Sequence, residues 1–132
     1  MTDTNAVTAQ IVEAWSRIAS DTSELDDDAP WLHDPGGRDW LQVRLVEWHR
    51  ADSGAAVVHL LQQSLPLPVA GLCVRDIIRA CNEAFAPIAG WIATETVAGG
   101  HDDEDLAAAV AEVEPALRAA VDRAIERALD RG

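Results

Sequence analysis

The chain has 132 residues, which is enough for one domain and too few for a second sizeable core. Its formal net charge is −13, all ten cationic side chains are arginine, and 48% of its residues are hydrophobic. An anionic excess of this size repels phosphate backbones and argues against nucleic-acid binding, and the absence of lysine excludes phosphate-loop and Schiff-base chemistry. No apolar run is long enough for a membrane span and no signal-like segment opens the chain, so we expect a cytoplasmic protein with no membrane contact.

The N-terminal segment carries a helical pattern. Val7, Ile11, Trp15 and Ile18 repeat every three or four residues, which predicts a helix over residues 5–20, capped by Asp3 or Thr4. The following stretch, DTSELDDDAPWLHDPGGR, is rich in acids, proline and glycine and predicts a loop over residues 21–38.

The next segment fits two structures. Leu41, Leu45 and Trp48 fall on one helical face with Asp39 as a suitable N-cap, whereas the alternation Leu41, Val43, Leu45 also suits a strand. A turn at residues 51–54 would complete a β-hairpin over about 40–63. The helix is favoured, and the chain is expected to be mostly α, with an α+β fold as the alternative.

Two further helical patterns follow a loop at Pro66 and Pro68. The first runs from about residue 74 to 92, with Pro87 expected to break or kink it, and a Gly99–Gly100 pair closes the section. The second starts at an acidic first turn near residue 102, where Pro115 is expected to divide it into two helices. We therefore divide the chain into a helical domain, 1–99, and a C-terminal acidic amphipathic segment, 100–132, which offers a surface for self-association.

Motifs for metal binding or catalysis are missing. The histidines are scattered, and Cys73 and Cys81 form no C-x-x-C pair, so we expect no metal site, no disulfide scaffold and a reduced compartment. Neither Cys81 nor Ser53 lies in a nucleophile elbow. The sequence leaves catalytic activity open and favours a non-catalytic role without a cofactor.

Residues 12–46 resemble the first half of an acyl or peptidyl carrier protein of polyketide and nonribosomal peptide synthesis. Such proteins have a first helix with a central Trp, a loop of the type ELDPDAPFFDLGGDSL and a second helix continuing LAVRLV. Here Trp15 is followed by ELDDDAPWLHDPGGRDWLQVRLV over residues 24–46, in which VRLV matches outright. The resemblance implies a small helical bundle, to which this chain adds extra C-terminal helices.

The attachment serine of that family is missing. Carrier proteins bear phosphopantetheine on the Ser of GGDSL, and Arg38 and Asp39 stand here in place of its Asp and Ser. A carboxylate cannot accept the arm, although an anion is favourable at a helix N-terminus. Ser53, which follows the matching helix, is a weak alternative attachment site.

The resemblance implies a carrier-like interaction domain that catalyses nothing and carries no arm. We expect it to bind a protein partner, such as a synthase or ligase subunit. The expected partner-binding residues belong to the acidic loop and the start of the second helix: Asp26, Asp27, Asp28, Trp31, Asp39, Trp40, Arg44 and Trp48. The alternatives are an acidic inhibitor or immunity-type protein that covers a basic partner site, and a small α+β enzyme.

Overall fold

Four helices contain almost all of the residues that the computed structural model describes, which are 4–21, 36–99 and 102–131. They are α1 (Thr4–Ala19), α2 (Gly37–Ser64), α3 (Leu67–Ala98) and α4 (Asp103–Arg131). No strand occurs within these ranges. The helix predicted over the first segment is confirmed, the helical interpretation of residues 40–63 is correct, and the hairpin alternative is wrong.

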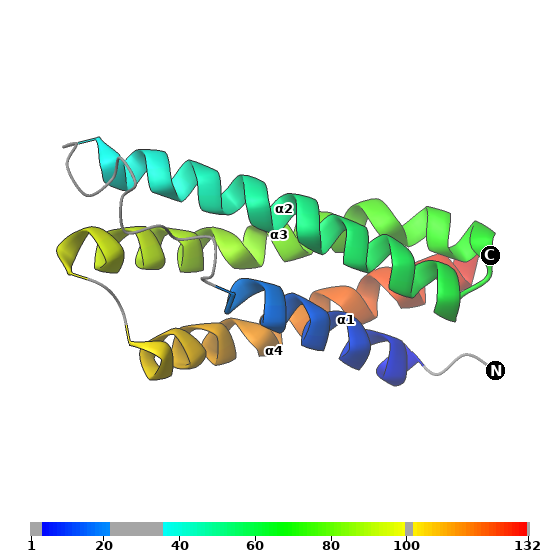
Figure 1. The fold of residues 1–132 in the computed structure, drawn as a ribbon. Coiled ribbons are helices and arrows are strands. Elements are labelled where there is room, and N and C mark those ends of the chain that lie inside the picture. The colour runs from blue at the N-terminus through cyan, green and yellow to red at the C-terminus, as the bar shows by residue number, and fades with distance from the viewer. Residues whose placement is uncertain (1–3, 22–35, 100–101, 132) are drawn as a thin grey trace.

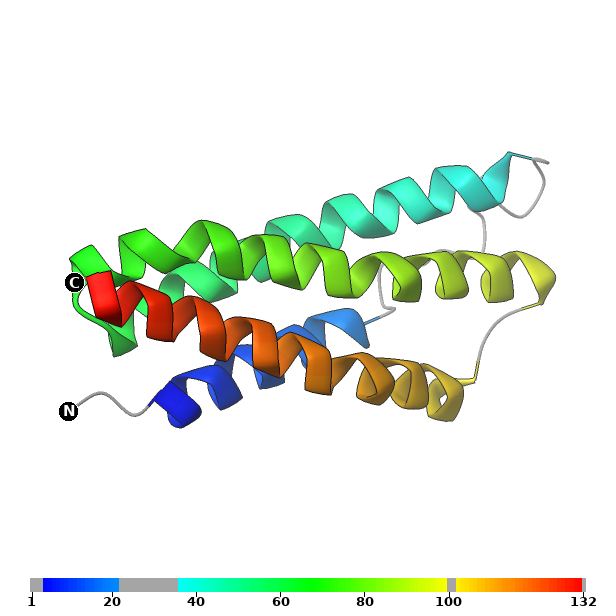
Figure 2. The ribbon, with the colours of Figure 1, turned by 180° about the vertical axis from the view of Figure 1, so that it is seen from behind.

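The helices form an antiparallel bundle in which each runs against its neighbours (Figure 1). α2, α3 and α4 are long rods, whereas α1 has 16 residues and lies along only part of the bundle, as the reverse view shows (Figure 2). α1 packs against α2 and α4, α3 packs against the same two helices, and α1 and α3 face each other across the diagonal. The connections from α2 to α3 and from α3 to α4 are short, which favours antiparallel packing of these neighbours.

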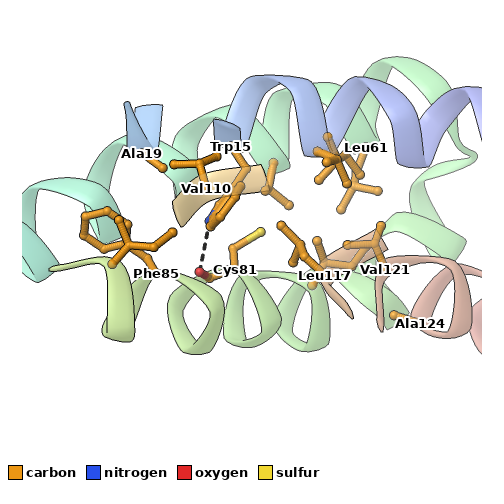
Figure 3. Packing of buried hydrophobic residues seen from close by; sticks show 14 of the residues in the cluster. Trp15, Ala19, Leu61, Cys81, Phe85, Val110, Leu117, Val121 and Ala124 are labelled. Carbon is orange, nitrogen blue, oxygen red and sulfur yellow. Dashed lines mark hydrogen bonds between the residues drawn. The ribbon is translucent and has the colours of Figure 1, made fainter. Parts of the chain in front are cut away.

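All four helices contribute to one hydrophobic core (Figure 3). Trp15 is 1% exposed and donates a hydrogen bond from its Nε1 to the main-chain oxygen of Cys81, 3.1 Å away, so α1 reaches α3 across the diagonal. The buried Thr8 hydroxyl donates to the Asp122 carboxylate and ties α1 to α4. Leu106, Val121 and other α4 residues are buried in the same cluster, so the C-terminal segment packs with the predicted helical domain.

The buried side of α2 repeats every four residues. Its buried side chains are Leu41, Leu45, His49, Ser53, Val57 and Leu61, preceded by Gly37. This spacing forms a narrow stripe directed at the core. Two of its six side chains are polar, which makes the centre of α2 an unusual part of the interior.

Both internal prolines lie within continuous helices, so the predicted division at Pro115 is wrong, and of the two outcomes expected at Pro87 the break does not occur. Each proline is exposed, as are Glu83 and Ala111, whose main-chain oxygens lose the usual N–H donor. Water can hydrate those oxygens, and the buried residues on both sides of each proline hold the helix in the bundle. α3 ends as predicted at Gly99, whose φ of 138° is rare for other residue types.

The described helices include none that is long and apolar enough to cross a membrane.

Candidate functional site

An aromatic and charged surface covers the first half of α2. Trp40, Arg44 and Trp48 are spaced four residues apart and therefore lie one above the other on the helix. The Arg44 guanidinium lies 5.7 Å from the Trp40 ring centroid and 5.6 Å from that of Trp48. These distances are within the range of cation–π attraction, so one arginine interacts with two tryptophans.

Neighbouring side chains extend this surface. Val43 is 56% exposed, and Glu47 accepts a hydrogen bond from Arg44 at 3.3 Å. We call the surface made by Asp39, Trp40, Val43, Arg44, Glu47 and Trp48 the α2 face. All six residues belong to one helix, α2, which fixes their backbone positions relative to one another.

The N-terminal turn of α2 is tied to the end of α3. Arg38 donates from its Nε to the Thr94 hydroxyl, 2.7 Å away, and its Nη1 lies 3.4 Å from the Asp39 carboxylate. Asp39 is in the first turn and its side chain is 84% exposed, whereas Gly36 is the N-cap and has no side chain to cap with. The prediction of Asp39 as the N-cap is therefore wrong, although its carboxylate still gains from the helix dipole.

A small pocket lies next to Trp48, between the end of α1, α2 and α3. Its volume is about 70 Å³. Its lining residues are Ile18, Asp21, Leu45, Trp48, His49, Asp52 and Phe85. Apolar and aromatic side chains thus share the pocket with the carboxylates of Asp21 and Asp52.

His49 forms part of the wall of this pocket and packs against two aromatic rings. Its imidazole stacks on Phe85 with centroids 3.9 Å apart and meets Trp15 edge-on at 5.9 Å. Neither ring nitrogen has a hydrogen-bond partner among the described residues, and burial lowers the His49 pKa from 6.5 to about 4. His49 is therefore neutral at physiological pH.

The remaining candidates for chemistry are buried. Ser53 is 1% exposed, so its hydroxyl faces the core and is closed to a modifying enzyme. Burial raises the pKa of the Cys73 thiol and raises that of Cys81 to about 12, which disfavours the reactive thiolates. Within residues 4–21, 36–99 and 102–131, no group of three or more His, Cys, Asp or Glu side chains is arranged to hold a metal ion.

The structure thus brings four of the predicted partner-binding residues, Asp39, Trp40, Arg44 and Trp48, onto the α2 face. Asp26, Asp27, Asp28 and Trp31, as well as the capping candidate Asp3, lie outside the described residues. The burial of His49 was not predicted from the sequence. The signal that could have found it is the four-residue repeat from Leu41 to Leu61, which passes through His49 and Ser53.

Comparisons of the chain with protein-family models, with characterised proteins and with solved structures find no match. The function proposed below therefore rests on the surface chemistry of the helices.

Proposed function

We propose that this chain is a non-catalytic binding domain that contacts a protein partner through the α2 face. The observation that carries the proposal is the arrangement of Trp40, Arg44 and Trp48. Tryptophan and arginine are the residue types that most often dominate the energy of protein interfaces. Trp40 keeps 42% of its surface exposed, although burying it would remove a large apolar area from water.

The α2 face is also organised in advance of binding. Arg44 contacts both tryptophan rings and pairs with Glu47, so these side chains have already lost part of the freedom that binding would otherwise remove. Within this face, Asp39 and Glu47 carry negative charge and Arg44 carries positive charge. A partner surface with apolar pockets and a mixed polar rim would fit it.

We propose as partner a synthase or ligase subunit that normally meets carrier proteins. The resemblance implies a first helix, a loop and a second helix that opens at the glycine pair, and α1 and α2 have bounds that agree with this order. Asp39 occupies the exposed first turn of α2, where a carrier would present its attachment serine. The 28-residue α2 and the 32-residue α3 depart from the resemblance, which implies a short third helix.

The buried reactive groups support the non-catalytic part of the proposal. Cys73 and Cys81 are enclosed thiols with raised pKa values, and His49 is an enclosed imidazole. A nucleophile or a general base must reach its substrate to act, and these three groups lie inside the bundle.

The partner class is tested by measuring binding to a panel of purified synthase and ligase domains that act on carrier proteins. We expect one of them to bind, and Trp40→Ala and Arg44→Glu each to weaken that binding by about tenfold or more, as is typical of central interface residues. Arg118→Glu is the matched control, because it makes the same charge reversal as Arg44→Glu at an exposed position of α4, outside the α2 face. Equal binding by all four proteins, or binding by no domain of the panel, would contradict the proposal.

A second candidate, a protein that covers a cationic site, is favoured by the exposed acids Asp102, Asp103, Glu104 and Asp105 at the start of α4. These acids also suit a helix N-terminus by themselves. If Asp103→Asn with Glu104→Gln abolished partner binding while Arg44→Glu left it intact, the second candidate would replace the first.

The carrier-like character of the α2 N-terminus has its own test. Wild-type protein incubated with coenzyme A and a broad-specificity phosphopantetheinyl transferase should keep its intact mass, because Asp39 has no hydroxyl to attack the diphosphate. Asp39→Ser should gain one pantetheinyl arm, since the new hydroxyl would stand on the exposed first turn. Refusal by Asp39→Ser beside a fully loaded control carrier would remove the carrier-like surface from the argument.

A further inference from the structure

A second surface, remote from the α2 face, is notable for its lack of charge. One quarter of the residues of this chain are charged, yet residues 53–74 contain no Asp, Glu, Lys or Arg. This stretch forms the second half of α2, the turn at Leu65 and Pro66, and the first turns of α3. It lies at one end of the bundle, where α2 passes into α3 (Figure 1).

An apolar groove of about 180 Å³ runs between α2 and α3 within this stretch. Its lining residues are Val58, Leu61, Gln62, Leu67, Ala70, Gly71 and Val74. A Cβ atom added to Gly71 would meet nothing within 4 Å, so the groove is open at this position. Gln62 supplies its single polar side chain.

Two leucines project beside the groove. Leu67 is 69% exposed and Leu72 is 44% exposed, and both belong to the first two turns of α3. The same patch therefore holds projecting apolar side chains and a recess that can receive one. A twofold-symmetric contact needs this combination, because each copy must present both halves of the fit.

We propose that this groove is the interface of a homodimer, in which Leu67 of each copy enters the groove of the other. The charge distribution selects a second copy as the occupant. Two chains of net charge −13 repel each other over most approaches, and a contact through residues 53–74 brings together the longest stretch of each chain that carries no charged side chain. A net charge of −13 also makes this protein poorly suited to an anionic lipid surface.

This dimer should respond to salt in the opposite sense to one held by ion pairs. Added salt screens the repulsion between the two anionic chains and leaves the apolar contact intact. The association should therefore strengthen as the ionic strength rises. The proposal is independent of the partner assigned to the α2 face, because the two surfaces share no residue.

Sedimentation equilibrium of the full chain, from about 5 to about 500 μM protein and from about 50 to about 500 mM NaCl, tests the proposal. We expect a monomer–dimer equilibrium that tightens with salt. Leu67→Asp should weaken it about tenfold or more by placing a charge at the contact, and Gly71→Leu should weaken it similarly by filling the groove.

Matched controls separate the groove from a general effect of these substitutions. Val97→Asp places the same charge at an exposed valine near the C-terminal end of α3, and Ala107→Leu adds bulk at an exposed position of α4, and neither residue belongs to residues 53–74 or to the α2 face. Both controls should dimerise like wild type, and circular dichroism of all four variants should report intact helices.

A monomer at every concentration would overturn the proposal. So would a dimer that weakens with salt, or one that Leu67→Asp and Gly71→Leu leave unchanged. A monomer that co-sediments with neutral phosphatidylcholine vesicles, and loses this binding in Leu67→Asp, would assign the patch to lipid instead and would equally overturn it.

Discussion

Lowering the pH from 6.5 to 4 is expected to remove about 3 kcal/mol of stability through His49 alone. Its pKa is 6.5 in an unfolded chain and about 4 in the bundle. Between these values the unfolded chain binds a proton that the folded protein excludes, so the free energy of unfolding falls as the pH falls. The contribution of the neutral imidazole is complete above pH 6.5 and is lost by about pH 4.

The physical cause is the burial of the His49 imidazole without a partner that could stabilise its positive charge. His49 is 3% exposed and packed between Phe85 and Trp15, and no carboxylate among the described residues pairs with its ring nitrogens. Asp21 and Asp52 line the neighbouring pocket without reaching these nitrogens. A charged imidazolium in this place would be desolvated and unpaired.

His49→Phe isolates this effect. The substitution retains an aromatic ring to stack on Phe85 and removes two buried nitrogens that lack partners, so we expect it to be neutral or stabilising at pH 7. His59→Phe is the matched control, because His59 lies on the same helix but is exposed. Urea unfolding followed by tryptophan fluorescence between pH 4 and 7.5 measures all three proteins.

The carboxylates are the same in the three proteins, so their effect on the free energy of unfolding cancels in the comparison. The difference in acid sensitivity between wild type and His49→Phe therefore reports His49. Wild type and His59→Phe should lose about 3 kcal/mol more than His49→Phe on acidification. A parallel decline in all three would show that His49 does not exclude the proton as its burial implies.

The helices of this chain are predictable because their apolar residues recur with a helical period. Val7, Ile11 and Trp15 are spaced so that one helical face is apolar, and the structure buries all three. The continuation of α3 and α4 through their prolines cannot be predicted from local sequence. Whether Pro87 or Pro115 ends a helix depends on whether the freed main-chain oxygens face water and the flanking residues face a core, and only the packed bundle decides that.

The candidate site was predictable to a similar degree. The four-residue spacing of Trp40, Arg44 and Trp48 is visible in the sequence, and it places the three side chains on one face in any helix. The four-residue repeat of α2 also passes through His49 and Ser53, but residue type argues against their burial, because histidine is only intermediate in burial and serine is mostly exposed. Their enclosure follows from α1 and α3 packing on both sides of the α2 stripe, which is a property of the assembled bundle.

Trp15 links α1 to the interior of the bundle around His49. It is the largest fully buried side chain among the described residues, and it lies on α1, the shortest of the four helices. Its indole N–H bonds to the Cys81 main-chain oxygen on α3 and its ring meets His49 on α2 (Figure 3 shows the hydrogen bond). A single side chain of α1 thus contacts both helices that enclose His49.

Trp15→Ala is therefore expected to cost about 3–5 kcal/mol, the range typical of a large aromatic residue removed from a core. Trp15→Phe should cost less, about 1–2 kcal/mol, because it keeps most of the ring and loses the hydrogen bond. Trp40→Ala, on the α2 face, should stay within about 0.5 kcal/mol of wild type. Guanidinium unfolding followed by circular dichroism measures the three free energies. If Trp15→Ala proved as stable as Trp40→Ala, α1 would not be anchored through Trp15.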